Sequence, residues 1–130
     1  MKRLKITYWV STIFFATIFT TTGILYLLHF PAIAKRTLDL YYPAYLLDII
    51  GTAKILGAVA LVTPKYKHLK EWAYAGFTFD FIGAMWSHFY VQGINKYVLI
   101  IIPLSILMVS YITYHRLQAG QARLLLNETN

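Results

Sequence analysis

The chain has 130 residues, of which 58% are hydrophobic and only 13% are charged, whereas a soluble domain carries about 25% charged residues. Four apolar spans of about 20 residues would use roughly 80 positions, which leaves no stretch long enough for a large catalytic domain outside a membrane. The sequence contains no cysteine, and this excludes disulfides, thiolate metal ligands and thiol redox chemistry within the chain.

The charge balance is basic, with 12 Lys and Arg against 5 Asp and Glu and a formal net charge of +7. In a soluble protein this balance would indicate binding to nucleic acid. Here the cations lie between apolar runs and form no basic helix face, so membrane topology explains them better. We therefore expect a lipid bilayer as the surroundings and no nucleic-acid partner.

Four apolar segments follow one another along the chain, and each is long enough to cross a ~30 Å hydrocarbon layer as a helix. Short connections with Pro31, Pro64 or Gly93 separate them. The runs are continuous and lack the alternation of an outer-membrane barrel. The prediction is an all-α fold, an integral membrane antiparallel four-helix bundle forming one transmembrane domain. Its expected spans are residues 6–30, 43–63, 69–91 and 97–115, followed by a tail at 116–130.

The first segment follows Lys2, Arg3 and Lys5, and a basic start before an apolar run is also typical of a secretory signal peptide. The apolar part of a signal peptide is about 7–15 residues long. This run continues well beyond that length. The sequence therefore favours a retained membrane span over a cleaved signal.

The cations near the ends of the spans are distributed unequally between the two sides. The side with Lys35, Arg36 and Lys96 holds fewer of them than the other side. The positive-inside rule then places both termini, the turn at residues 64–68 and the C-terminal tail in the cytoplasm. The cations on the predicted cytoplasmic side are Lys2, Arg3, Lys5, Lys65, Lys67, Lys70, Arg116 and Arg123.

Three ionisable residues lie well inside the apolar spans: Asp48, Lys54 and Asp80. Such residues are candidates for function because a charge in lipid is costly unless it is paired or hydrated. Lys54 and Asp80 are equally far from position 67 in the connecting turn, so two antiparallel helices would hold them at the same depth. We expect them to form an intramembrane ion pair or proton relay. The alternative is a pair that only fixes the register of the helices.

Helical spacing places small and polar residues on one stripe of each middle span. Small residues let helix backbones approach closely, and polar side chains then bond across the contact. The two stripes are therefore expected to pack together, with Lys54 and Asp80 where they meet. The stripes comprise Leu47, Gly51, Lys54, Ala58 and Leu61 in one span and Gly76, Asp80, Gly83, Ala84, Ser87 and His88 in the next.

A second polar and aromatic set lies nearer the outer ends of the spans. An acid and a histidine beside flat aromatic side chains would suit a quinone headgroup, which needs hydrogen-bond partners and apolar walls. The alternative is a boundary histidine bonded to backbone or water. No metal site is predicted, because the histidines and the acid come from three helices without ligand spacing. The members are His29, Tyr45, Asp48, Trp86, Ser87, His88 and Tyr90.

The two middle segments resemble the DoxX-like family of small bacterial membrane proteins. The family's pattern has a lysine between glycines, an acid in the next helix and a serine-histidine pair near the end of that helix. Lys54, Asp80, Ser87 and His88 match these positions. The resemblance covers roughly Tyr8–His115 and is most specific in GTAKILGA at 51–58 and LKEWAYAGFTFDFIGAMWSH at 69–88.

The resemblance implies a four-helix protein of the bacterial inner membrane with a link to respiratory redox chemistry. Relatives include a membrane subunit of thiosulfate:quinone oxidoreductase and components of membrane assemblies that handle oxidative stress. The chain has no recognisable haem or flavin motif, so it would be a subunit and no self-sufficient enzyme. We expect a quinone as the cofactor, bound near Tyr45, Asp48, Trp86, Ser87 and His88, and other membrane subunits or a second copy as partners.

Two other functions stay open from the sequence. One is a small proton-coupled transporter, although four-helix exporters of similar length carry an essential acid in the first span. Residues 6–30 contain no acid, so Asp80 would have to serve. The other is a non-catalytic assembly or scaffold protein, in which Lys54 and Asp80 would only position the helices.

Overall fold

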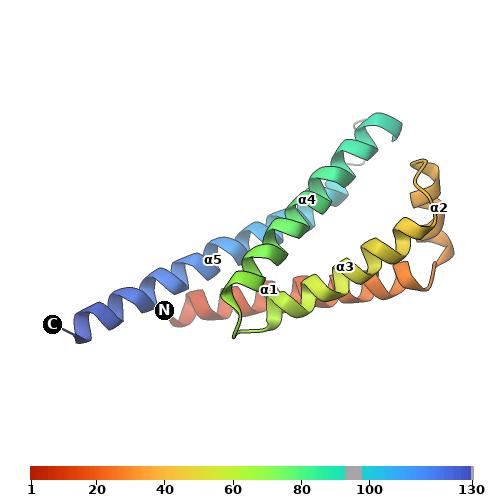
Figure 1. The fold of residues 1–130 in the computed structure, drawn as a ribbon. Coiled ribbons are helices and arrows are strands. Elements are labelled where there is room, and N and C mark those ends of the chain that lie inside the picture. Colours follow the sequence, from red (N-terminus) through yellow and green to blue (C-terminus); the bar gives the residue numbers. More distant parts are fainter. Residues whose placement is uncertain (93–97, 130) are drawn as a thin grey trace.

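The computed structural model describes residues 1–92 and 98–129 (Figure 1). Within these ranges the ordered elements are helices and no strand occurs. Three of them, α1, α3 and α5, are long and apolar enough to cross a membrane, judged by length and composition. The helices are α1 (Lys2–Leu27), α2 (Pro31–Asp39), α3 (Tyr45–Val62), α4 (Lys67–Gln92) and α5 (Val98–Glu128).

The helix α4 corresponds to the third predicted span and is 26 residues long. It is not among the three apolar helices, because Asp80, His88 and several weakly apolar residues lower its hydropathy. The four-span arrangement is therefore confirmed only as an all-helical fold with three candidate spans. The predicted turn at Gly93, together with Lys96 and Tyr97, lies outside the described residues.

Two helical stretches extend beyond the predicted spans. Residues 31–39 form α2 where the sequence predicted only a connection. Pro31 begins this helix, and proline is favoured at the first helical position because its φ angle already fits and its missing N–H needs no partner there. At the other end, α5 continues through most of the predicted tail to Glu128.

The helix α1 lies at the centre of the arrangement, with α3 along one side and α5 along another. The helices α1 and α3 run in opposite directions, and α4 diverges from α3 beyond their shared turn (Figure 1). The start of α1 lies beside the last third of α5, because a Cβ atom on Gly120 would lie 2.9 Å from the Met1 Cε atom. Both ends of the chain are thus at the same end of the molecule (Figure 1).

The helices α1 and α3 approach each other closely at two glycines. A Cβ atom on Gly23 would lie 2.9 Å from the carbonyl oxygen of Gly51, and one on Gly51 would lie 2.9 Å from the carbonyl oxygen of Gly23. A carbonyl oxygen is part of the helix backbone and cannot turn aside as a flexible side chain can. This approach therefore depends on the absence of a side chain at both positions.

The sequence predicts that the small residues of α3 and α4 pack against each other, and this prediction is wrong for the glycines. Gly51 faces α1, and the positions beside Gly76 and Gly83 on α4 are open space. Gly57 instead lies against the ring of Phe77, where an added Cβ atom would come within 2.8 Å of the ring. The aromatic ring occupies the contact between α3 and α4, so the small residues of α4 cannot approach α3 closely.

Four phenylalanines form the centre of the core between α1 and α4. Phe15 and Phe19 stack with ring centroids 4.2 Å apart. Phe77 meets their edges at 5.0 and 5.1 Å, and Phe81 lies 5.5 Å from Phe19. These four residues, Phe15, Phe19, Phe77 and Phe81, are called the phenylalanine cluster below.

Candidate functional site

Lys54 of α3 and Asp80 of α4 face each other, with 3.4 Å between the lysine Nζ and a carboxylate oxygen. Equal spacing from the turn predicts this juxtaposition. The lysine Nζ also lies 4.8 Å from the ring centroid of Phe19 and 5.0 Å from that of Tyr26. Its charge therefore contacts one carboxylate and two aromatic faces, each of which attracts a cation.

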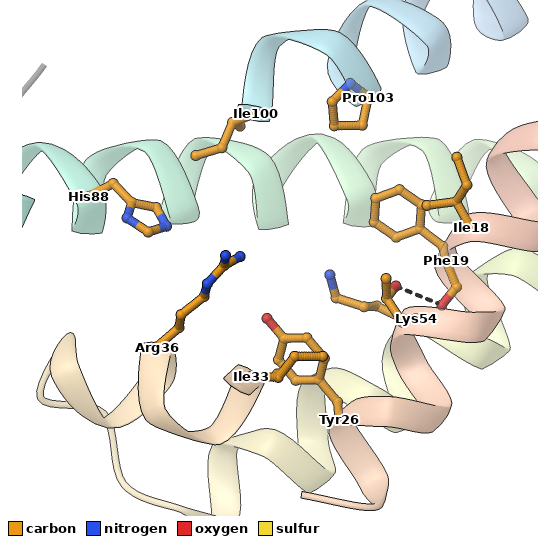
Figure 2. A pocket seen from close by; sticks show the side chains of 10 residues that line it. Ile18, Phe19, Tyr26, Ile33, Arg36, Lys54, His88, Ile100 and Pro103 are labelled. Carbon is orange, nitrogen blue, oxygen red and sulfur yellow. Dashed lines mark hydrogen bonds between the residues drawn. The ribbon is translucent and has the colours of Figure 1, made fainter. Parts of the chain in front are cut away.

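A cavity of about 380 Å³ lies on the α1 side of Lys54. Figure 2 shows the side chains of Tyr26, Arg36, Lys54 and His88 reaching into this space from α1, α2, α3 and α4. Isoleucine, phenylalanine and proline side chains supply the apolar walls. This space is called the central cavity below. Its lining residues are Ile18, Phe19, Thr22, Tyr26, Ile33, Arg36, Lys54, His88, Ile100 and Pro103.

Only part of the predicted headgroup set lines the central cavity. His88 does so together with Lys54. Asp48 is instead exposed, and its carboxylate accepts a 2.9 Å hydrogen bond from the Nε2 of His29. Trp86 and Tyr45 are 69% and 65% exposed and do not line the central cavity. The structure thus brings His88 to Lys54 and leaves the other three outside the central cavity.

Ser87 bonds to the loop before α3. Its hydroxyl forms a hydrogen bond with the hydroxyl of Tyr42. This contact joins α4 to the segment between α2 and α3, close to where α2 covers the central cavity. Ser87 itself does not line the cavity, so its position supports the wall and does not contribute a donor to the interior.

Sequence reasoning missed Arg36 and Tyr26 as members of the site. The sequence indicates Arg36 only as a cation near the membrane surface, and it predicts a connection where the helix α2 lies. A proline at the first helical position, with Ile33 and Arg36 three residues apart on one face, is the signal that could have found it. Tyr26 follows Phe19 and Thr22 at helical spacing and therefore lines the same wall.

A buried polar cluster lies on the other side of the phenylalanine cluster. Ser110 of α5 bonds to Thr12 at 2.7 Å and to the hydroxyl of Tyr74 at 2.8 Å. The Nζ of Lys70 donates a 2.6 Å hydrogen bond to the hydroxyl of Tyr8. Along α1 the order is Tyr8 and Thr12, then two phenylalanines, then the central cavity, so the phenylalanines separate the two polar regions.

The position of Lys70 differs from its sequence interpretation as a surface cation. Its exposure is only 3%, and its Nζ lies 5.2 Å from the ring centroids of both Tyr8 and Tyr114. Tyr8 and Tyr114 are likewise buried. Aromatic faces and a phenolic oxygen surround the ammonium group, which explains how this charge is accommodated.

We expect the change Ser110→Ala to lower the free energy of unfolding by about 1–3 kcal/mol, because it removes the buried hydroxyl that bonds to both Thr12 and Tyr74. Thermal unfolding in detergent measures this loss. The matched control is Ser105→Ala, since the exposed hydroxyl of Ser105 bonds only to a carbonyl oxygen of its own helix. Equal stability of the two variants would show that the cluster contributes nothing.

The sequence profile of the DoxX-like family matches residues 10–113, which is most of the chain. The chain belongs to the DoxX-like family. This confirms the resemblance seen in the two middle segments. No curated protein and no solved structure matches the chain. Membership of the DoxX-like family and three apolar helices together indicate a membrane protein.

The matched range contains every residue of the central cavity, from Ile18 to Pro103. It also contains the buried polar cluster except Tyr8. Among the residues that the structure describes, no three His, Asp or Glu side chains come together as metal ligands. The side chains that line the central cavity offer hydrogen-bond donors and positive charges.

Proposed function

We propose that this DoxX-like protein spans the bacterial inner membrane four times and binds a quinone, or a small lipophile of similar chemistry, in the central cavity. In this role it would be a membrane subunit of an oxidoreductase or of an oxidative-stress assembly. The observation that carries the proposal is one partly open cavity in which Lys54, Arg36 and Tyr26 present donors between apolar walls.

The lining suits a quinone because the two chemistries are complementary. Quinone oxygens accept hydrogen bonds, whereas lysine and arginine side chains only donate them. The flat ring needs apolar contact, which Ile18, Phe19 and Ile100 provide. The cavity volume of about 380 Å³ falls within the range of roughly 300–1,000 Å³ that is typical of ligand pockets.

The low hydropathy of α4 does not exclude a fourth span. With 26 residues the helix is about 39 Å long, which exceeds the ~30 Å hydrocarbon layer. Its charged residues Lys70 and Asp80 have partners inside the molecule, at Tyr8 and Lys54. Polar groups satisfied within the protein are tolerated at membrane depth. The excess of cations near both termini supports a cytoplasmic location for the end of the molecule where the termini lie.

The transport alternative has no observation in its favour. A proton or substrate that crosses along α1 would have to pass the phenylalanine cluster, whose rings lie between the central cavity and the buried polar cluster. A scaffold role requires no cavity lined with donors. Both alternatives are outcomes that the following experiments distinguish.

Photolabelling of the purified full chain with an azidoquinone tests the proposal. Peptide mapping should find the label within residues 18–26, 33–36 or 100–103, or at Lys54 or His88, and excess unlabelled quinone should displace it. Label at Trp86 and Tyr45 alone would support the outer pocket that the sequence predicted. Labelling that unlabelled quinone does not compete away would refute a specific site.

A further inference from the structure

The central cavity has an excess of positive charge. Arg36 and Lys54 both line it, and no carboxylate is among its described lining residues. Their positive groups point into the same space, with the ring of His88 across from them (Figure 2). A site built only to bind neutral carbonyl oxygens would need hydrogen-bond donors but no such concentration of charge.

Only one of the two cations has an acidic partner. Asp80 pairs with Lys54 from the α4 side, and within the described part of the chain no ion pair includes Arg36. The positive charge of Arg36 therefore stays unbalanced next to the apolar walls formed by Ile33 and Ile100. Arg36 is an exposed residue, and a negatively charged headgroup in the cavity would be attracted by its unbalanced charge and by its guanidinium donors.

We infer that the central cavity selects a lipophile whose headgroup carries a negative charge, in the quinone class an ionised hydroxyquinone or quinol. This inference rests on the proposed function and specifies the charge state of its ligand. Arg36 supplies the charge that decides the preference, because Lys54 is already balanced by Asp80. The guanidinium group presents several donors in one plane and suits a headgroup with two adjacent oxygens.

The test compares two naphthoquinones with the same alkyl chain, one carrying a 2-hydroxyl that ionises at neutral pH and one carrying a neutral 2-methyl. Equilibrium binding to the purified full chain should favour the ionised compound by about tenfold or more, as expected for a charge-assisted hydrogen bond. The change Arg36→Gln should bring the ratio of affinities close to one. The matched control Lys35→Gln changes the neighbouring cation on α2, which does not line the cavity, and should preserve the ratio.

The outcomes separate the charge inference from the proposed function. Equal affinity for the two naphthoquinones overturns the inference while quinone binding stands. A preference that survives Arg36→Gln in a folded protein overturns the role of Arg36. A third probe, an alkyl phosphate of the same chain length, completes the design. If it binds in an Arg36-dependent way and neither naphthoquinone does, the charge inference holds and the quinone function fails. If no probe binds, both fail.

Discussion

Replacement of Gly51 by leucine is expected to lower the free energy of unfolding by about 3 kcal/mol, at the upper end of the usual cost of overpacking. A Cβ atom at Gly51 would lie 2.9 Å from the carbonyl oxygen of Gly23 and 3.0 Å from Tyr26 Cβ. Both atoms belong to or lie next to the backbone of α1, so the two helices would have to separate. Thermal unfolding of the detergent-solubilised protein measures the loss.

Two glycines on α4 provide matched controls for this change. The space beside Gly76 and Gly83 is open, and leucine has the higher helix propensity. Gly76→Leu and Gly83→Leu should therefore leave stability unchanged or raise it slightly. A loss at Gly83 as large as at Gly51 would mean that α4 packs through its small stripe after all, against α3 or another partner.

The change Lys54→Met is expected to weaken quinone binding by about tenfold to a hundredfold, the equivalent of one charged hydrogen bond of about 1.5–3 kcal/mol. Methionine has a similar length but no donor, so the shape of the cavity wall changes little. Lys54→Arg keeps a positive donor and should retain most of the affinity. Equilibrium binding of a short-chain ubiquinone analogue, together with thermal unfolding of each variant, gives both quantities.

A substitution of Asp80 distinguishes a role in quinone binding from a role in helix packing. Asp80 pairs with Lys54 but does not line the central cavity. Asp80→Asn should therefore reduce stability more than quinone affinity. If Lys54→Met folds normally and binds quinone as well as the unchanged protein does, the ion pair serves only the register of the helices, and the scaffold alternative gains support.

The positions of the four long helices and the meeting of Lys54 with Asp80 could be predicted from the sequence. Apolar runs bounded by prolines mark the helices, and a short turn between two of them fixes which residues lie at equal depth. The prediction of depth needs only the rise per residue and the centre of the turn. It does not depend on which other helices pack nearby.

The choice of neighbours could not be predicted in the same way. Helical spacing shows that Gly51 and Lys54 share a face, but it does not say which helix that face contacts. A glycine on α1 suits a close approach to Gly51 as well as a glycine on α4 would. In the structure Gly51 contacts Gly23 of α1, and the ring of Phe77 fills the contact between α3 and α4. The place of Arg36 in the site could not be predicted, because it depends on how α2 packs relative to α1.

The buried polar cluster shows a similar limit. Lys70 and Tyr8 lie near the ends of apolar runs, where the sequence predicts membrane-interface residues. Their mutual hydrogen bond is visible only once α4 and α1 are placed side by side. A cation near the end of a span is therefore ambiguous between a surface position and a buried one until its neighbours on other helices are known.

The central claim is that the central cavity binds a quinone through Lys54. Its most direct test is an equilibrium titration of the purified full chain with the short-chain ubiquinone analogue, beside the variants Lys54→Met and Lys35→Met. The expected result is saturable binding to one site, weakened at least about tenfold by Lys54→Met and unchanged by Lys35→Met. Non-saturable uptake, or equal affinity in all three folded proteins, would contradict the claim.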